Sequence, residues 1–195
     1  MVAVQLASAL LAELPPVVVC HELAPALLAG FEAVAVAAAA ADSAPQDDDA
    51  ASASAEVAGA AAAALRAFVS NLQRQGGGGA EAVTAVCTFV CQAYEAQPGR
   101  AEWLVGGTAV VAAFGGDEAA QPLLVELLHR LVSAGCAQLQ AAGGLDGAPP
   151  LAIGLFELLI AAGDATPAGL AASGALSTGL AMCAQLAATL NHSSH

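Results

Sequence analysis

The apolar residues between residues 98 and 144 recur with the period of two amphipathic helices. In the first half they share one face of a helix with 3.6 residues per turn: Trp103, Gly107, Val110, Val111 and Phe114. In the second half one side is apolar: Leu124, Leu127, Leu128, Leu131, Gly135 and Leu139. Gly115 and Gly116 separate the two segments, and Pro122 suits the first turn of the second helix. The pattern predicts an antiparallel hairpin, with Trp103 buried between its two helices beside the face of Phe114.

Comparable stripes predict helices on either side of this hairpin. They cover about residues 2–14, 25–41, 56–75, 80–97, 150–162 and 166–190. The helix at 150–162 contains the run LAIGLFELLIAA, which is apolar almost all round and is therefore predicted to be buried between neighbours. The last helix carries Leu176, Leu180, Cys183 and Leu186 as its apolar stripe.

Residues 42–54 differ in composition from the rest of the chain. Their sequence, DSAPQDDDAASAS, has no apolar periodicity and contains four aspartates. It predicts an acidic, solvated linker that can be shortened without loss of the fold. The linker divides a first helix pair, at residues 1–41, from about three further pairs at residues 55–195.

The spacing of the helices bears on the fold class. No strand-like alternation is found, so the chain is predicted to be all-α. The odd-numbered helices after the linker begin near residues 56, 101 and 150. HEAT and armadillo repeats are helix pairs with a period of roughly 40–47 residues. The spacing therefore predicts an α-α superhelix, a HEAT/armadillo-like solenoid of about four antiparallel helix pairs; a compact helical bundle is the competing arrangement.

The charge of the chain is strongly unbalanced. Its 195 residues contain four arginines, no lysine and seventeen acidic residues, for a formal charge of −13. Such a surface repels phosphate backbones and anionic headgroups, which argues against direct nucleic-acid binding and favours basic protein partners. The N-terminal segment lacks the positive region of a signal peptide.

No residue pattern predicts a catalytic, metal or cofactor site. Cys87 and Cys91 lie one helical turn apart, but no further pair of ligands accompanies them, so core packing is the preferred interpretation. His21 and His129 lack the partners of a catalytic arrangement, and His129 is expected in solvent or facing a groove. The glycines at 76–79 are not followed by the Gly-Lys-Ser/Thr of a phosphate-binding loop. Glu126 and Arg130 have the i,i+4 spacing of a helical ion pair.

The acidic run in the linker is the one candidate for partner binding. Asp47, Asp48 and Asp49 are adjacent. Either they belong to a solvent-exposed linker with no binding role, or they attract a basic peptide or protein electrostatically.

A membrane-spanning segment is a further alternative. Residues 165–190 carry no charged side chain, and they are long enough to cross a bilayer. The segment is nevertheless rich in Ala, Gly, Ser and Thr, and it lacks flanking arginines and an aromatic belt. These features argue against a span.

The order of several segments resembles a known family. A leucine-rich helix, QPLLVELLHRLVSAGCAQLQ, is followed by a proline-containing loop, an LFELL helix and a polar turn with Pro167. Upstream, LASALLAELPPVVVCHELAPALL and EAVTAVCTFVCQAY look like helix–turn–helix junctions of the same kind. Together these segments resemble the later HEAT repeats of the importin-β (karyopherin-β) superfamily, in its importin-thirteen and transportin-three branch.

The resemblance implies a non-enzymatic nuclear transport receptor that binds protein cargo, requires no cofactor and acts between nucleus and cytoplasm. Full receptors are much longer, so these residues would be a segment of one. The family is regulated by the GTPase Ran through its N-terminal repeats, which have no counterpart here, so no Ran-contacting residue is assigned. The alternatives are a generic helical-repeat interaction scaffold and a small membrane protein using residues 165–190.

Overall fold

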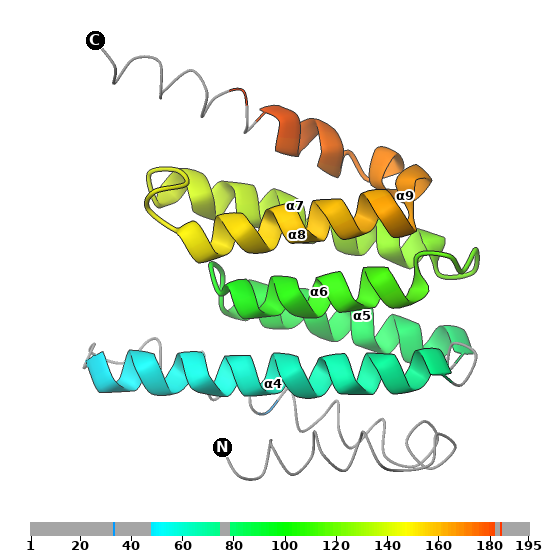
Figure 1. The fold of residues 1–195 in the computed structure, drawn as a ribbon, viewed down its shortest axis with the longest axis horizontal. Coiled ribbons are helices and arrows are strands. Elements are labelled where there is room, and N and C mark those ends of the chain that lie inside the picture. The colour runs from blue at the N-terminus through cyan, green and yellow to red at the C-terminus, as the bar shows by residue number, and fades with distance from the viewer. Residues whose placement is uncertain (1–32, 34–47, 75–78, 182–183, 185–195) are drawn as a thin grey trace.

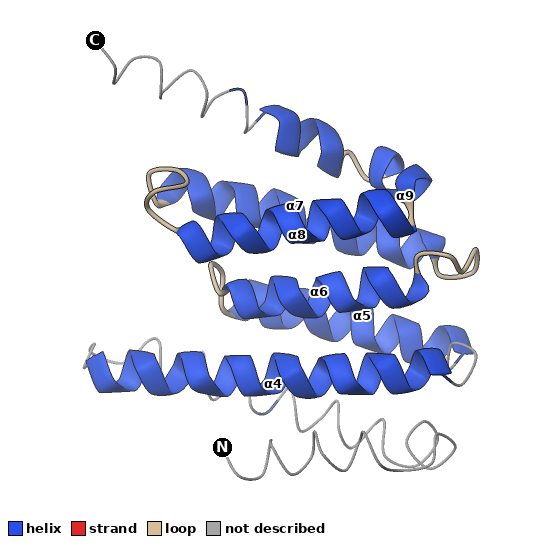
Figure 2. Ribbon diagram, viewed as in Figure 1, coloured by secondary structure: helices blue, strands red, loops and turns tan. Residues whose placement is uncertain are grey.

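A computed structural model describes Ala33 and residues 48–74, 79–181 and 184 (Figure 1). In these ranges the regular structure is helical throughout, without a strand (Figure 2). The helices, in chain order, are α4 (Asp48–Arg74), α5 (Gly79–Ala96), α6 (Ala101–Phe114), α7 (Gln121–Ala141), α8 (Pro149–Ala165) and α9 (Pro167–Ala172). Residues 175–181 form one more helical stretch. The all-α class is confirmed, whereas the predicted helix pair at 1–41 lies almost wholly outside the described residues.

The described helices form two layers. Helices α4, α6 and α8 run side by side in one layer, and α5 and α7 lie behind them in the other (Figure 1). The most extensive contacts of α6 are with α8 and α4, its neighbours within the layer, and not with α7. The predicted α6–α7 hairpin therefore exists as a connection, but it is not the main packing unit. From α4 to α8, each helix instead packs chiefly on a helix two places away along the chain.

Glycines allow α6 to approach its neighbours closely. A Cβ atom on Gly106 would lie 2.9 Å from Leu65 Cδ2 of α4, and one on Gly107 would lie 2.5 Å from Leu131 Cδ1 of α7. Both glycines are buried. Leucine side chains thus occupy the space that larger residues in α6 would need, so the leucines of neighbouring helices reach the α6 backbone.

Trp103 anchors the contact between the two layers. Its side chain is fully buried, and its ring meets that of Phe89 edge to face, with centroids 5.8 Å apart. Its indole Nε1–H donates a hydrogen bond to Gln97 Oε1 at 3.1 Å. The predicted burial is confirmed, but the aromatic neighbour belongs to α5. The prediction that Trp103 packs between α6 and α7 missed this contact, because periodicity fixes the inward face of a helix and not the helix it meets.

The end of α7 shows how glycine sets a boundary. Gly143 and Gly144 have φ angles of +86° and +100°, which favour glycine over other residues. Gly144 N–H donates to Leu139 O at 2.8 Å and Gly143 N–H donates to Gln140 O at 3.2 Å. This pair of bonds is the Schellman arrangement, which satisfies the last carbonyls of the helix. The chain then turns into α8, whose first turn begins with Pro149.

Two sequence predictions about helix boundaries and burial are wrong. The sequence predicts an acidic linker up to residue 54, but α4 begins at Asp48, so deleting Ser43 to Ser52 would remove its first turn. The alanines of this stretch favour helix, and acidic residues are favoured at a helix N-terminus. The prediction that α8 is buried all round also fails, because Ile153 and Ile160 are 58% and 64% exposed. Neighbouring helices cover only part of its circumference.

We expect Trp103→Ala to lower the free energy of unfolding by about 3–5 kcal/mol, the usual cost of replacing a buried large aromatic residue with alanine. Urea unfolding followed by circular dichroism measures this change. Ala112→Ser, at an exposed position of the same helix, should alter stability by less than about 0.5 kcal/mol. Equal effects of the two substitutions would contradict the central place of Trp103.

A pair of glycine substitutions tests the close approach of α6 and α8. A Cβ on Gly115 would lie 2.5 Å from Ala165 Cβ and 2.8 Å from its backbone carbonyl, and a backbone cannot move aside as a side chain can. We expect Gly115→Ala to destabilise the fold by about 1–3 kcal/mol. Gly59→Ala, in α4 with nothing within 4 Å of the added atom, should stabilise it by about 0.5–1 kcal/mol. The midpoint of thermal unfolding of each variant measures these changes. A higher midpoint for Gly115→Ala would contradict the close approach of Gly115 to Ala165.

Candidate functional site

The acidic run is divided by the boundary of the described chain. Asp47 lies outside the described residues, whereas Asp48 and Asp49 are the first two residues of α4. Two of the three aspartates therefore belong to a helix end and not to a loop. The role of the run as an attractor for a basic protein stays a prediction.

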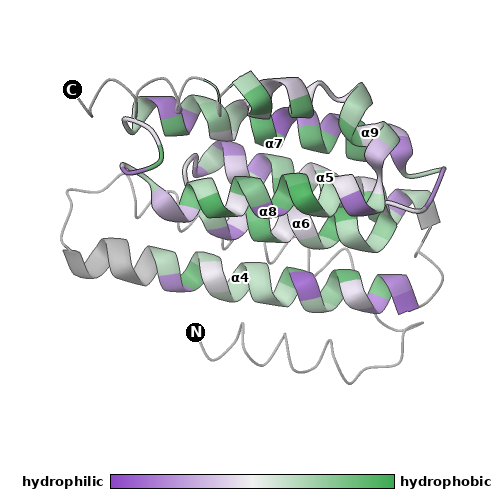
Figure 3. Ribbon diagram, turned by 45° about the horizontal axis from the view of Figure 1, so that its top comes forward, coloured by the Kyte–Doolittle hydropathy of each residue, from purple (hydrophilic) through white to green (hydrophobic). Residues whose placement is uncertain are grey.

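The most distinctive surface feature is a set of large hydrophobic side chains in solvent. Four such residues are exposed: Ile153, Ile160, Leu176 and Leu180. The first two lie on α8, where hydrophobic residues colour much of the helix in Figure 3. The other two lie on helix 175–181, where the sequence predicts an inward stripe that begins with these leucines. The structure instead buries Ala175 and Gly179, and Leu159 of α8 lies against Gly179.

Acidic residues share the exposed face of α8. Along the helix, Ile153, Glu157, Ile160 and Asp164 follow one another at spacings of three or four residues and are all exposed. Residues with this spacing lie on the same side of a helix. The opposite side of α8 is buried through Leu151, Leu155, Leu158 and Ala162. We call the stripe Ile153–Glu157–Ile160–Asp164 the α8 face.

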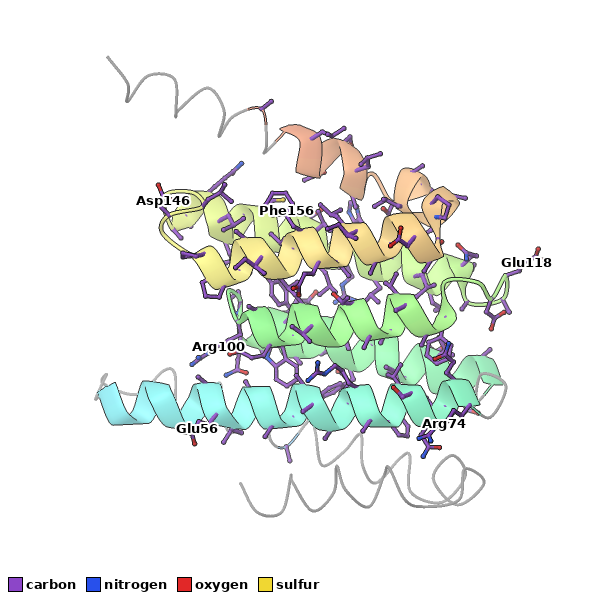
Figure 4. The ribbon with its side chains drawn as sticks, in the orientation of Figure 1. Glu56, Arg74, Arg100, Glu118, Asp146 and Phe156 are labelled. Carbon is purple, nitrogen blue, oxygen red and sulfur yellow. The ribbon has the colours of Figure 1, made fainter. Side chains whose placement is uncertain are left out.

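An open groove of about 450 Å³ lies where the α6–α7 turn meets the α8–α9 junction. Its lining combines small residues with few polar ones: Gly115, Glu118, Gln121, Val125, Ala165, Thr166, Pro167, Ala168, Gly169 and Ala172. Thr166 Oγ1 donates to Gln121 Oε1 at 2.6 Å, and Gln121 Nε2 donates to the Gly115 carbonyl at 2.6 Å. These hydrogen bonds join the α6–α7 turn to the α8–α9 junction. Glu118 points away from the helices at this end of the molecule (Figure 4).

The cysteines singled out in the sequence are core residues. Cys87, Cys91 and Cys136 are buried, and none of the three is in a disulfide bond. Burial raises the pKa of the Cys87 thiol to about 12 and that of Cys91 to about 11, with Cys91 adding to the shift at Cys87. Thiols with such values stay protonated at neutral pH and are poor nucleophiles. The preference for core packing over zinc binding agrees with this placement.

Tyr94 is buried beside these cysteines in α5. Its hydroxyl has no hydrogen bond of standard geometry within the described residues, although it lies near the backbone of Gly99. Burial raises the pKa of Tyr94 to about 12, and Gly99 partly opposes the rise. A hydroxyl so placed stays un-ionised near neutral pH.

The polar residues of α7 form contacts that differ from the predicted ones. Arg130 pairs with Glu95 of α5, with its Nε 3.0 Å from Glu95 Oε1, and not with Glu126 of its own helix. The hydrogen bond to Glu95 raises the pKa of Arg130. His129 is exposed as predicted, and its Nδ1 lies 3.1 Å from the Ser173 carbonyl. The sequence could not indicate the Glu95 pair, because its members are 35 residues apart.

The described part of the chain holds no group of three or more His, Cys, Asp or Glu side chains that could bind a metal ion. Among the helices that the structure describes, none has both the length and the hydropathy for a bilayer span. The candidate span at 165–190 is also interrupted, because α9 ends at Ala172 and Gly174 has a φ of +71° before the next helix. His21 lies outside the described residues.

Comparisons with known proteins do not place the chain in a family: no protein-family model, no curated protein and no solved structure matches it.

Because the two thiols are buried, we expect the free energy of unfolding to fall as pH rises in the alkaline range. Their pKa values rise from 9.0 in the unfolded chain to about 11 and 12 in the fold. Above pH 9.0 the unfolded chain ionises first, so the stability conferred by the neutral thiols declines as pH rises toward the folded values. We expect the urea midpoint to fall between about pH 8 and about pH 10. The double variant Cys87→Ala, Cys91→Ala should be less stable at pH 8 but show a flatter decline; an equally steep decline would contradict the assignment.

Proposed function

We propose that the chain is a non-enzymatic protein-interaction scaffold built as an α-helical solenoid. The arrangement of alternate helices supports this proposal: α4, α6 and α8 adjoin in one layer, as do α5 and α7 in the other. Helices α5 and α7 begin 42 residues apart, and α6 and α8 begin 48 residues apart. HEAT and armadillo units have a period of roughly 40–47 residues. In such proteins, successive helices of one layer form an extended binding surface.

The observation that carries the proposal is the exposed apolar surface of α8. Its large hydrophobic residues Ile153 and Ile160 are 58% and 64% exposed. Contiguous exposed apolar residues with a polar rim mark interaction sites in soluble proteins. The α8 face has this composition, since two carboxylates alternate with its two isoleucines.

The chemistry of the described residues supports binding over catalysis. The thiols of Cys87 and Cys91 are protonated and buried, and two of the polar side chains of the groove, Gln121 and Thr166, form a hydrogen bond with each other. His129 lies against a backbone carbonyl and not against an acid or a nucleophile. A general acid–base mechanism needs titratable groups with matched pKa values and a substrate position between them. The described groups give no such arrangement.

The narrower hypothesis is that the scaffold is part of an importin-β-type receptor acting between nucleus and cytoplasm. It rests on the resemblance in the sequence. The formal charge of −13 supports a basic cargo, although many acidic scaffolds share that property. A role for Ran would require contacts to which no residue of this chain has been assigned. Selectivity for basic nuclear proteins over equally basic proteins of other compartments would favour the receptor over a generic scaffold.

We expect the folded chain to bind basic proteins with an affinity that falls as salt rises, because exposed charges are screened over about 8–10 Å at physiological ionic strength. Replacing Asp47, Asp48 and Asp49 together by Asn should slow association several-fold and leave dissociation nearly unchanged. Surface plasmon resonance at several salt concentrations measures both rates. Asparagine is tolerated at helix N-termini, so α4 should persist, as circular dichroism can verify.

The matched control replaces Glu81, Glu102 and Glu118 by Gln, which removes three exposed or half-exposed acids of α5, α6 and the α6–α7 turn. If this variant slows association as much as the aspartate variant, net charge and not the acidic run guides the partner. If a panel of basic nuclear proteins shows no salt-sensitive binding to the folded chain, the proposed function fails.

A further inference from the structure

The α8 face is the part of the described surface with the clearest mismatch between composition and environment. Ile153 and Ile160 are 58% and 64% exposed, although isoleucine is among the residues most often buried. Phe156 lies between them in the sequence of α8, and its side chain is half-buried. Figure 4 labels this residue. The two isoleucines are seven residues apart, which places them two turns apart on nearly the same side of α8.

The attachment of α8 to the core does not require these isoleucines. Leu155 and Leu158 are fully buried on the opposite side, and Gly154 lets α8 approach α6 until an added Cβ would lie 3.2 Å from Leu104 Cδ1. Leu155 also covers Gly135 of α7. Ile153 and Ile160 contribute little to this attachment, because more than half of each side chain lies in solvent. Their apolar character therefore points to a contact outside the described core.

The charges on the α8 face indicate the kind of partner. Glu157 and Asp164 are exposed on the same stripe, and no described residue forms an ion pair with either. The ion pair between Arg130 and Glu95 lies elsewhere and joins α7 to α5. A second copy of this chain, with its charge of −13, would bring acids against acids. A basic partner would instead neutralise both carboxylates while covering the isoleucines.

We propose that the α8 face binds a basic amphipathic helix of a protein partner. The apolar residues of that helix lie on Ile153 and Ile160, and its Lys or Arg side chains pair with Glu157 and Asp164. At 1.5 Å per residue the stripe from Ile153 to Asp164 is about 16 Å long, so it accommodates about three turns of the partner. The proposal rests on the interaction-scaffold function and assigns that function a surface and a partner chemistry.

Two displayed peptide libraries test this proposal with the full chain as target. Both contain amphipathic helices of about four turns with varied apolar residues; one has Lys and Arg on its flanks and the other has Glu. We expect enrichment from the basic library alone. The Kd of an enriched peptide, measured by fluorescence anisotropy, should rise at least about tenfold for Ile153→Ser, Ile160→Ser, equivalent to about 1.4 kcal/mol. Glu157→Gln, Asp164→Asn should weaken binding less and flatten its salt dependence.

The matched control is Leu176→Ser, Leu180→Ser, which removes the other exposed apolar pair and should leave the Kd unchanged. All these substitutions are at exposed positions, and circular dichroism checks that each variant folds. If both double variants raise the Kd equally, the peptide binds exposed apolar residues non-specifically, which would overturn the proposal. No enrichment from the basic library, or equal enrichment from the acidic one, would overturn it as well.

Other occupants of the face give distinct results. If analytical ultracentrifugation shows that the unchanged chain forms an oligomer and that the Ile153→Ser, Ile160→Ser variant is monomeric, the α8 face binds a second copy of the chain. If the basic library is enriched only after residues 185–195 are removed, the α8 face binds a segment of the chain itself. Either result overturns the proposed partner. If the chain binds basic proteins in a salt-sensitive way while the isoleucine variant binds them equally well, this inference fails and the scaffold function stands.

Discussion

The close approach of α6 to the helices around it is the contact on which the rest of the described structure depends. Gly106 and Gly107 leave the α6 backbone open to leucines from α4 and α7, while Gly154 lets α8 lie against Leu104. In a chain so rich in alanine, large side chains are few, and close contact through glycine compensates for the small volume that alanine fills. Helix α6 meets α4 on one side and α8 on the other, and the connecting helices α5 and α7 lie behind this layer (Figure 1). The surface pair that joins α7 to α5 contributes at most about 1 kcal/mol, so the buried contacts hold the arrangement.

The same geometry leaves the outer side of α8 uncovered. Its inner leucines complete the core, and helix 175–181 lies near Leu159 without covering Ile153 or Ile160. The resulting stripe of two isoleucines and two carboxylates is the described feature best suited to recognition. The groove by Gln121, by contrast, is held together by its own hydrogen bonds, and the buried Cys87 thiol is inert. The proposed function therefore lies on a surface and not in a cavity.

Local patterns in the sequence determined the helices themselves. The 3.6-residue period located α5 to α8 and the inward faces of α5 to α7, including the burial of Trp103, Cys87 and Cys91, because the period follows from helix geometry alone. Glycine and proline marked most boundaries for the same local reason. The start of α4 was missed because aspartate and serine usually indicate a loop, yet a helix N-terminus also favours them.

Which helix meets which was decided only by the tertiary structure. The layering of α4, α6 and α8, the Glu95–Arg130 pair and the Trp103–Phe89 contact join residues whose relation no periodicity encodes. The exposure of the α8 face was also decided by the tertiary structure. When a predicted helix is apolar on nearly every side, its sequence does not show which side lacks a neighbour. The proposal of a basic partner comes from the acidic composition, whereas the proposed binding surface comes from the fold, because only packing determines which apolar residues remain in water.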